Sequence, residues 1–163
     1  MIYPEFRLAM GQMLVEGGRL EENLKRAEGM VSKASQDKCQ MIILPECSDL
    51  GWTHPSAREL AREIPGETSD RLCQAARKNN VMVVAGLTER EGSRIYNSAI
   101  LIDQSGKILL KYRKINVLKI EQDIYSVGNI LSVAETRFGT IGVNICADNF
   151  GNSIAIGHVQ ARM

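Results

Sequence analysis

The segment Met41-Ile42-Ile43-Leu44-Pro45-Glu46 decides the fold class that we expect for this chain. Four apolar residues follow one another and stop at a proline, which cannot donate to a strand ladder. The run therefore predicts a buried strand that ends at Pro45. Residues 20–34 precede it with apolar side chains at helical spacing, which predicts an amphipathic helix. A helix that leads into a buried strand is typical of α/β proteins.

Outward from this segment, strand and helix patterns continue along the whole chain. A second helix is expected at residues 68–78, capped by Thr68 and ended by Asn79-Asn80. Strands are expected at residues 6–13, 81–87, 95–102, 108–112, 131–136 and 140–145, with hairpin links at 103–106 and 137–139. A last helix is expected from about Asn152 to Met163. The pattern predicts a helix-covered sheet with hairpins mixed in, within a single domain.

Composition excludes several classes of protein. Hydrophobic residues make up 44% of the 163 residues and charged residues 24%, which is enough apolar surface to offset chain entropy. The net charge of +1 gives no single-sign field for nucleic acid or an anionic membrane. The sequence shows no secretory signal pattern and no apolar run of about 20 residues that could span a bilayer. We therefore expect a cytoplasmic protein with neither a nucleic-acid nor a membrane partner.

The four cysteines, Cys39, Cys47, Cys73 and Cys146, form no C-x-x-C pair and match no zinc spacing. In a reducing cytosol we expect them to be free thiols. A free thiol can act as a nucleophile when a base lies close to it. The chemistry of this chain therefore depends on which side chains gather around one of these cysteines.

Glu46 directly follows the apolar run and lies near the carboxyl end of the predicted strand, where ligands bind in open α/β sheets. An apolar surround would raise the pKa of this carboxyl and make it a better base near neutral pH. The alternative interpretation is a solvated glutamate in a turn.

Lys114 ends another strand pattern. Alternation with period two places it on one face with Leu110 and Tyr112, away from Lys111 and Arg113. A lysine at the rim of such an apolar face can stabilise a developing oxyanion. The alternatives are a solvated basic strand end, or a small patch of three cations that contacts phosphate or nucleic acid. No P-loop or G-x-G-x-x-G motif supports that patch.

Cys146 falls at the end of a third strand pattern, on the face opposite Ile145. A sharp turn there could expose the sulfur and aim the backbone N–H of Ala147 at a developing oxyanion. The alternative is a buried cysteine that behaves as a small hydrophobe. His54 or His158 could supply the base of a Cys–His pair, and a carboxylate together with a lysine could do the same work.

Three blocks of sequence, taken in order, carry a family resemblance. They are Leu44-Pro45-Glu46-Cys47, Tyr112-Arg113-Lys114-Ile115-Asn116 and Asn144-Ile145-Cys146-Ala147-Asp148-Asn149. In this order they resemble the signature blocks of the nitrilase superfamily, the carbon–nitrogen hydrolases. Ala9-Met10-Gly11-Gln12 also resembles the opening strand of that family. The resemblance implies an α-β-β-α sandwich with a Glu-Lys-Cys triad and a second glutamate nearby.

Carried over residue by residue, the resemblance implies roles for five positions. Cys146 would be the nucleophile, Glu46 the general base, and Lys114 the cation that stabilises the oxyanion together with the N–H of Ala147. Glu121 would be the second glutamate, which positions Lys114 and the substrate amine; a surface helix residue is its alternative. The implied reaction is amide-type hydrolysis through a thioester, with no metal or organic cofactor. The implied partners are a small amide-type substrate and a second copy of the chain, in a homodimer or higher homo-oligomer.

Two features depart from the family pattern. Asn116 stands where many members carry a histidine, and members continue well beyond the cysteine-bearing strand. We therefore expect one carbon–nitrogen hydrolase domain over residues 1–163 that is truncated at its C-terminal end, with a bare sheet edge. A catalytically incomplete fragment that binds or assembles with other chains is the alternative function. Cys146-Ala147-Asp148 lacks the Trp-Glu pair of nitrile-specific members, so we expect an amide or carbamoyl-amide substrate.

Overall fold

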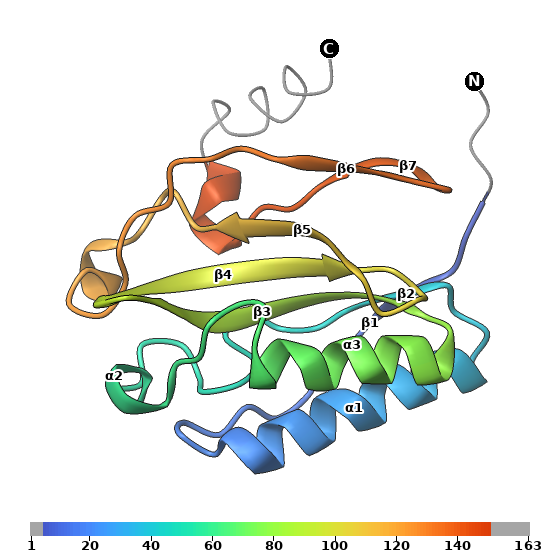
Figure 1. Cartoon of the computed structure of the whole chain (residues 1–163), viewed down its shortest axis with the longest axis horizontal. Helices are drawn as coiled ribbons and strands as arrows, with labels where there is room; N and C mark the ends of the chain where they lie inside the picture. The colour runs from blue at the N-terminus through green and yellow to red at the C-terminus, as the bar shows by residue number, and fades with distance from the viewer. Residues whose placement is uncertain (1–4, 151–163) are drawn as a thin grey trace.

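The computed structural model describes residues 5–150 of the chain (Figure 1). Its helices are α1 (Leu20–Gln36), α2 (Ala57–Leu60) and α3 (Glu67–Asn79). Its strands are β1 (Leu8–Met10), β2 (Met41–Ile43), β3 (Met82–Glu91), β4 (Arg94–Ile102), β5 (Ile108–Arg113), β6 (Val133–Thr136) and β7 (Gly139–Gly142). Two 3₁₀ turns lie at Lys119–Glu121 and Cys146–Phe150. The helix expected from about Asn152 to Met163 lies outside the described residues.

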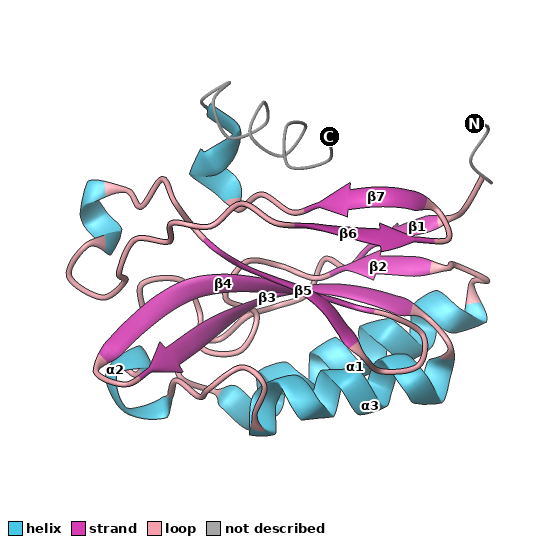
Figure 2. Ribbon diagram, turned by 45° about the horizontal axis from the view of Figure 1, so that its top comes forward, coloured by secondary structure: helices cyan, strands magenta, loops and turns pink. Residues whose placement is uncertain are grey.

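Five strands form one sheet in the order β1-β2-β3-β4-β5. The first three are parallel to one another, whereas β4 is antiparallel to both β3 and β5. Helices α1 and α3 cover one face of this sheet, and the β6–β7 hairpin lies over the other face (Figure 1 and Figure 2). The described residues therefore build an α layer and two β layers of the expected α/β sandwich.

Side chains from the five-stranded sheet fill a core on each of its faces. The core under the helices includes Val31, Ile42, Leu72, Val83 and Ile100. The core under the hairpin includes Met41, Val84, Leu101, Tyr112 and Val143. Because successive strand residues point to opposite faces, a strand between two cores is apolar at every position. This arrangement explains the unbroken apolar run of β2, from which the α/β fold class was predicted.

The two long helices agree with the sequence pattern except at one cap. The residues of α1 that lie against the sheet include Leu24, Ala27, Val31 and Ala34, at the predicted spacing. The predicted cap of α3 is wrong: the Ser69 hydroxyl, and not Thr68, accepts the N–H of Gly66 at the helix start. Thr68 is buried in the first turn. Asn80 ends α3 with φ +53, a left-handed conformation that asparagine tolerates.

The strand predictions differ from the structure mainly in length. Both predicted hairpins are present as antiparallel pairs, β4 with β5 and β6 with β7. Strand β3 continues through the charged residues 89–91 because β4 pairs with it from Val83 to Glu91. Strand β1 is shorter than expected because only three residues of β2 pair with it. The short helix α2 was not predicted.

Within residues 5–150, no helix is both long enough and apolar enough to cross a bilayer. All four cysteines fall in this range and are free thiols. Cys47 is buried, whereas Cys146 is exposed at the surface.

Candidate active site

Lys114 is the centre of a buried ion cluster. It directly follows β5, and its N–H donates to the Asn97 carbonyl at 2.9 Å, which continues the alternation of the strand. Its side chain therefore shares a face with Tyr112, as predicted, but it lies deeper than the expected rim, at 1% exposure. Its Nζ donates to Oε1 of Glu46 at 2.9 Å and to Oε1 of Glu121 at 2.7 Å. The structure thus brings three of the predicted site residues into contact.

A tight turn after β2 positions Glu46. The N–H of Leu44 donates to a β3 carbonyl at 2.8 Å, and the carbonyl of Pro45 accepts the N–H of Gly86 in β3 at 3.2 Å. Cys47 follows with φ +46. The turn lies directly on Gly86 of β3, where a Cβ would come within 2.6 Å of the Glu46 Cα. Because only glycine permits this approach, β3 helps to fix where the carboxylate lies.

Asn97 of β4 is a second donor to Glu46, and sequence reasoning missed it. Its Nδ2 donates to Oε1 of Glu46 at 2.6 Å, so that this oxygen receives both Asn97 and Lys114. Among the described residues, no donor reaches the other oxygen, Oε2. The buried Oδ1 of Asn97 also has no partner within the described part of the chain. The available signal was a polar residue on the apolar face that Asn97 shares with Ala99 and Leu101.

Glu121 lies in the 3₁₀ turn after β5 and is fully buried, so the surface-helix alternative does not hold. Its Oε2 accepts the N–H of Leu118 at 2.7 Å. Its Oε1 accepts the indole N–H of Trp52 at 2.5 Å, in addition to the Lys114 ammonium. Every oxygen of this carboxylate therefore has at least one donor.

Gly128 holds the segment that carries Glu121 against the end of β5. Its N–H donates to the Lys114 carbonyl at 2.8 Å, and a Cβ at this position would lie 2.2 Å from the Arg113 carbonyl oxygen. Only glycine fits so close to the strand. Tyr125 in the same segment accepts the N–H of Thr53 on its hydroxyl at 3.3 Å. The segments that carry the two carboxylates are therefore packed on each other.

The charges of the cluster stabilise one another. Burial alone would lower the pKa of Lys114, but its hydrogen bonds to Glu121 and Glu46 raise that pKa above the ordinary value. Burial alone would raise the pKa of Glu121, but the hydrogen bonds from Lys114 and Trp52 hold that pKa below the ordinary value. Near neutral pH the protein therefore keeps Lys114 as an ammonium and Glu121 as a carboxylate.

Cys146 begins the 3₁₀ turn that follows β7. Strand β7 ends at Gly142, but the alternation continues, because Val143 and Ile145 are buried and Cys146 is exposed. The backbone of Cys146 has φ +43, in the left-handed region that favours glycine. A non-glycine residue there is strained, and strain of this kind clusters at functional sites.

Asp148 anchors the turn of Cys146, and sequence reasoning assigned it no role. It is fully buried. Its Oδ2 accepts the Tyr112 hydroxyl at 2.8 Å and the Ile145 N–H at 3.2 Å, and its Oδ1 accepts the Asn116 N–H at 2.7 Å. The sequence signal that could have indicated this role is a carboxylate inside the third signature block, next to apolar residues.

These contacts fasten the turn of Cys146 to the chain segment that carries Lys114. Tyr112 and Asn116 both hold Asp148, and they flank Lys114 along the chain. The Asn116 side chain also donates to the Ala147 carbonyl at 3.5 Å. The structure therefore places Cys146 and Ala147 on a turn tied to the lysine segment. Within residues 5–150, the ion pairs of the cluster join Lys114 to Glu46 and Glu121, and no hydrogen bond joins the Cys146 thiol to any of these three side chains.

The alternative interpretations from the sequence find little support in the structure. His54 is hydrogen-bonded to the Ser56 hydroxyl at 2.8 Å, and His158 lies outside the described residues. Lys111 and Arg113 pair with the buried Glu89 at 2.5 and 2.6 Å. These cations are neutralised within the fold, so they do not form a free basic patch for phosphate or nucleic acid.

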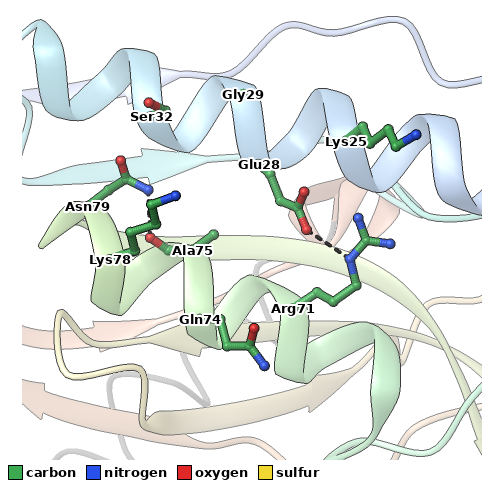
Figure 3. A pocket seen from close by; sticks show the side chains of 9 residues that line it. All are labelled: Lys25, Glu28, Gly29, Ser32, Arg71, Gln74, Ala75, Lys78 and Asn79. Atoms are coloured by element: carbon green, nitrogen blue, oxygen red, sulfur yellow. Dashed lines mark hydrogen bonds and ion pairs between the residues drawn. The ribbon is translucent and has the colours of Figure 1, made fainter.

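A groove of about 450 Å³ lies away from the ion cluster, between α1 and α3 on the outer helical layer (Figure 3). It is lined by polar and charged side chains, and Arg71 donates to Glu28 there at 2.8 Å. None of the candidate site residues lines it. Over residues 5–150, no group of three or more His, Cys, Asp or Glu residues is arranged to hold a metal ion.

Comparison with known proteins identifies the family of this chain. Residues 7–159 match the family described as carbon-nitrogen hydrolase. Omega-amidase NIT2 of Xenopus tropicalis is 33% identical over 88% of this chain and 55% of the relative. The nitrilase of Pyrococcus abyssi is 36% identical over 80% of this chain and 51% of the relative. The chain therefore spans about half the length of the curated relatives it matches.

A solved structure matches the fold over nearly the whole chain. It is that of Saccharomyces cerevisiae Nit3, described as a member of branch 10 of the nitrilase superfamily. The match has a TM-score of 0.85 and 25% identity, and it covers 95% of this chain and 60% of that chain. The described α and β layers are thus those of a nitrilase-type sandwich.

Proposed function

Because this chain belongs to the carbon–nitrogen hydrolase family, we propose that it carries the active site of an amidase. The observation that carries the proposal is the buried ammonium of Lys114 between the carboxylates of Glu46 and Glu121. Asp148 fastens the turn of Cys146 to the chain segment that carries that ammonium. In this proposal the exposed thiol of Cys146 works with the base Glu46 and the cation Lys114, and these are the groups that hydrolysis through an acyl-enzyme requires.

The proposed reaction has two halves. In the first, Sγ of Cys146 attacks the amide carbon, and Glu46 takes the thiol proton and passes it to the leaving nitrogen. The C–N bond breaks, ammonia or an amine leaves, and a thioester remains on Cys146. In the second half, water gives a proton to Glu46 and attacks the thioester. The carboxylic acid then leaves, and the proton returns to the sulfur.

The hydrogen bonds support different tasks for the two carboxylates. Oε1 of Glu46 is occupied by Asn97 and Lys114, so Oε2 is the oxygen available for proton transfer. Glu121 has donors on both oxygens and serves to hold Lys114 and orient the substrate amine. The ammonium of Lys114 and the N–H of Ala147 stabilise the oxyanion of the tetrahedral intermediate.

We propose an amide or carbamoyl amide as the substrate, and not a nitrile. The residues after Cys146 are Ala147 and Asp148, without the Trp-Glu pair of nitrile-specific members. The Xenopus relative is named an omega-amidase, which supports the same choice, whereas the Pyrococcus relative is named a nitrilase. Assays should therefore measure ammonia release from primary amides, carbamoyl amides and nitriles in parallel.

The first test removes the nucleophile. Cys146→Ala is expected to lower ammonia release by 10³-fold or more, an order typical of a lost covalent nucleophile. Its urea unfolding midpoint should stay unchanged because the side chain is exposed. Cys39→Ala is the matched control and should retain full activity. Turnover by Cys146→Ala at the level of the control would contradict the assignment.

A second measurement tests the thiol without turnover. Iodoacetamide should alkylate Cys146 faster in the folded chain than in the urea-unfolded chain, because an activated thiolate reacts faster than a free thiol. Exposure alone cannot produce this result, since unfolding exposes every thiol fully. Cys39 and Cys73 should react more slowly in the folded chain. Equal or slower alkylation of folded Cys146 would count against an activated nucleophile.

A further inference from the structure

Trp52 lies in the turn between Glu46 and α2, and one end of it contacts the ion cluster. Its indole N–H donates to Oε1 of Glu121 at 2.5 Å, although the residue as a whole is 42% exposed. The tryptophan therefore contacts the cluster through its indole N–H, while much of its ring remains at the surface. Sequence reasoning gave it no role.

Glu121 and Glu46 accept the same kinds of hydrogen bond on one oxygen and differ at the other. Each Oε1 accepts the Lys114 ammonium and one neutral donor, which is Trp52 for Glu121 and Asn97 for Glu46. The difference is at Oε2. This oxygen accepts a backbone N–H in Glu121, whereas no described donor reaches it in Glu46.

We propose that Trp52 is a positioning residue for the hydrolysis proposed above: its N–H fixes Glu121 as the carboxylate that holds Lys114. Glu46 is then the carboxylate free to transfer protons. Without the indole donor, the two carboxylates would compete more evenly for Lys114, and the ammonium would lose its fixed place in the cluster. The proposal rests on the amidase function, and it adds a residue to which no role has been given.

The turn that carries Trp52 is built to hold this contact. Gly51 and Thr53 on either side have φ +83 and +56, so the chain is sharply folded at Trp52. The N–H of Thr53 donates to the Tyr125 hydroxyl at 3.3 Å. Two neighbouring residues thus contact the segment that carries Glu121, and the turn after Glu46 is clamped to that segment at both points.

The first experiment compares two variants that each remove one polar group from this clamp. Trp52→Phe keeps an aromatic ring and removes the N–H that reaches Glu121. We expect kcat to fall about 10-fold, the cost of one hydrogen bond to a charged group, with KM unchanged within about twofold. The acid limb of the pH–rate profile should move to higher pH, because Glu121 then takes up a proton more readily.

Tyr125→Phe is the matched control. It removes the hydroxyl that accepts Thr53 but leaves the donor on Glu121 in place, so it should destabilise the fold without moving the acid limb. If Trp52→Phe has wild-type kcat and an unmoved acid limb, or if both variants shift that limb equally, Trp52 has only a structural role and the proposal is wrong.

The second experiment needs no substrate. Trp52 is the single tryptophan of the chain, so its fluorescence reports on Glu121 directly. Emission should change as Glu121 is protonated, with a midpoint below the ordinary glutamate pKa of about 4.3, and Glu121→Gln should abolish this transition. Absence of the transition in the folded wild-type chain would overturn the proposed contact. If Cys146→Ala stayed active, the amidase proposal would fail, but the fluorescence transition would be unaffected. Failure of the amidase proposal can therefore be told apart from failure of the Trp52–Glu121 contact.

Discussion

The ion cluster of Glu46, Lys114 and Glu121 and the turn of Cys146 are held in place by different means. In the cluster, Lys114 and Glu121 are buried, Glu46 is 24% exposed, and the charged atoms are bonded to one another. In the turn, the thiol is exposed, and its neighbour Asp148 makes the anchoring contacts. A buried charge is costly unless it is paired and fully hydrogen-bonded, whereas an exposed thiol requires only a fixed backbone. The charges are therefore positioned by side chains and the nucleophile by its turn.

The largest effect should come from removing the shared cation of the cluster. Lys114→Met leaves Glu46 and Glu121 facing each other without a counter-charge, and we expect a loss of about 3–5 kcal/mol in the free energy of unfolding. Lys111→Met is the matched control, because Glu89 keeps Arg113 as a partner. The control should lose about 1 kcal/mol or less. If urea unfolding gave equal losses of unfolding free energy for both variants, the cluster would stabilise the fold no more than the partly exposed pair of Lys111 and Glu89.

The same variant has a defined pH dependence. The pKa of Glu121 is lowered in the folded state, so its stabilising contribution is present above the unfolded pKa of about 4.3 and is lost as pH falls through the folded pKa. The pKa of Lys114 is raised, so its contribution is present below about pH 10.4 and is lost as pH rises through the folded pKa. The difference in stability between wild type and Lys114→Met should therefore be largest between about pH 5 and 10.

The parts that the sequence predicted are those that a short-range pattern can reveal. The apolar run before Glu46 and the alternation from Tyr112 to Lys114 place these side chains without any knowledge of distant partners. The fold followed from the same periodicities. The predicted cap at Thr68 is wrong because α3 begins earlier, at Glu67 after Gly66, and the local backbone rather than the residue type sets this start.

The parts that the sequence did not predict depend on pairs far apart in the chain. Trp52 meets Glu121 across 69 positions, and Asn97 meets Glu46 across 51. Such contacts arise from the packing of whole segments, which close approaches at Gly86 and Gly128 make possible. Local propensity contains no information about them, so neutral donors to a predicted ion cluster cannot be found from spacing alone.

An intermediate effect should come from Asp148, which anchors the turn of Cys146. Asp148→Ala removes the acceptor of three donors, and we expect a loss of about 1–3 kcal/mol in stability together with about a 100-fold fall in ammonia release. The fluorescence of Trp52 should keep its acid transition, because the ion cluster is not touched. A changed transition would show that the two regions are coupled. Tyr112→Phe removes only one of the donors and should cost about 1 kcal/mol.

The smallest effect should come from Asn116, the position where many family members carry a histidine. Its contribution to the anchor is the backbone N–H that donates to Asp148 at 2.7 Å, whereas its exposed side chain reaches the Ala147 carbonyl only at 3.5 Å. Asn116→His keeps the N–H, so we expect less than about 0.5 kcal/mol in unfolding free energy and less than about a threefold change in kcat. Urea unfolding and ammonia release would check both values beside Asp148→Ala. A loss as large as that of Asp148→Ala would mean that the asparagine side chain, and not the backbone, aligns the turn of Cys146 with Lys114. The departure from the family pattern would then be a determinant of activity in this chain.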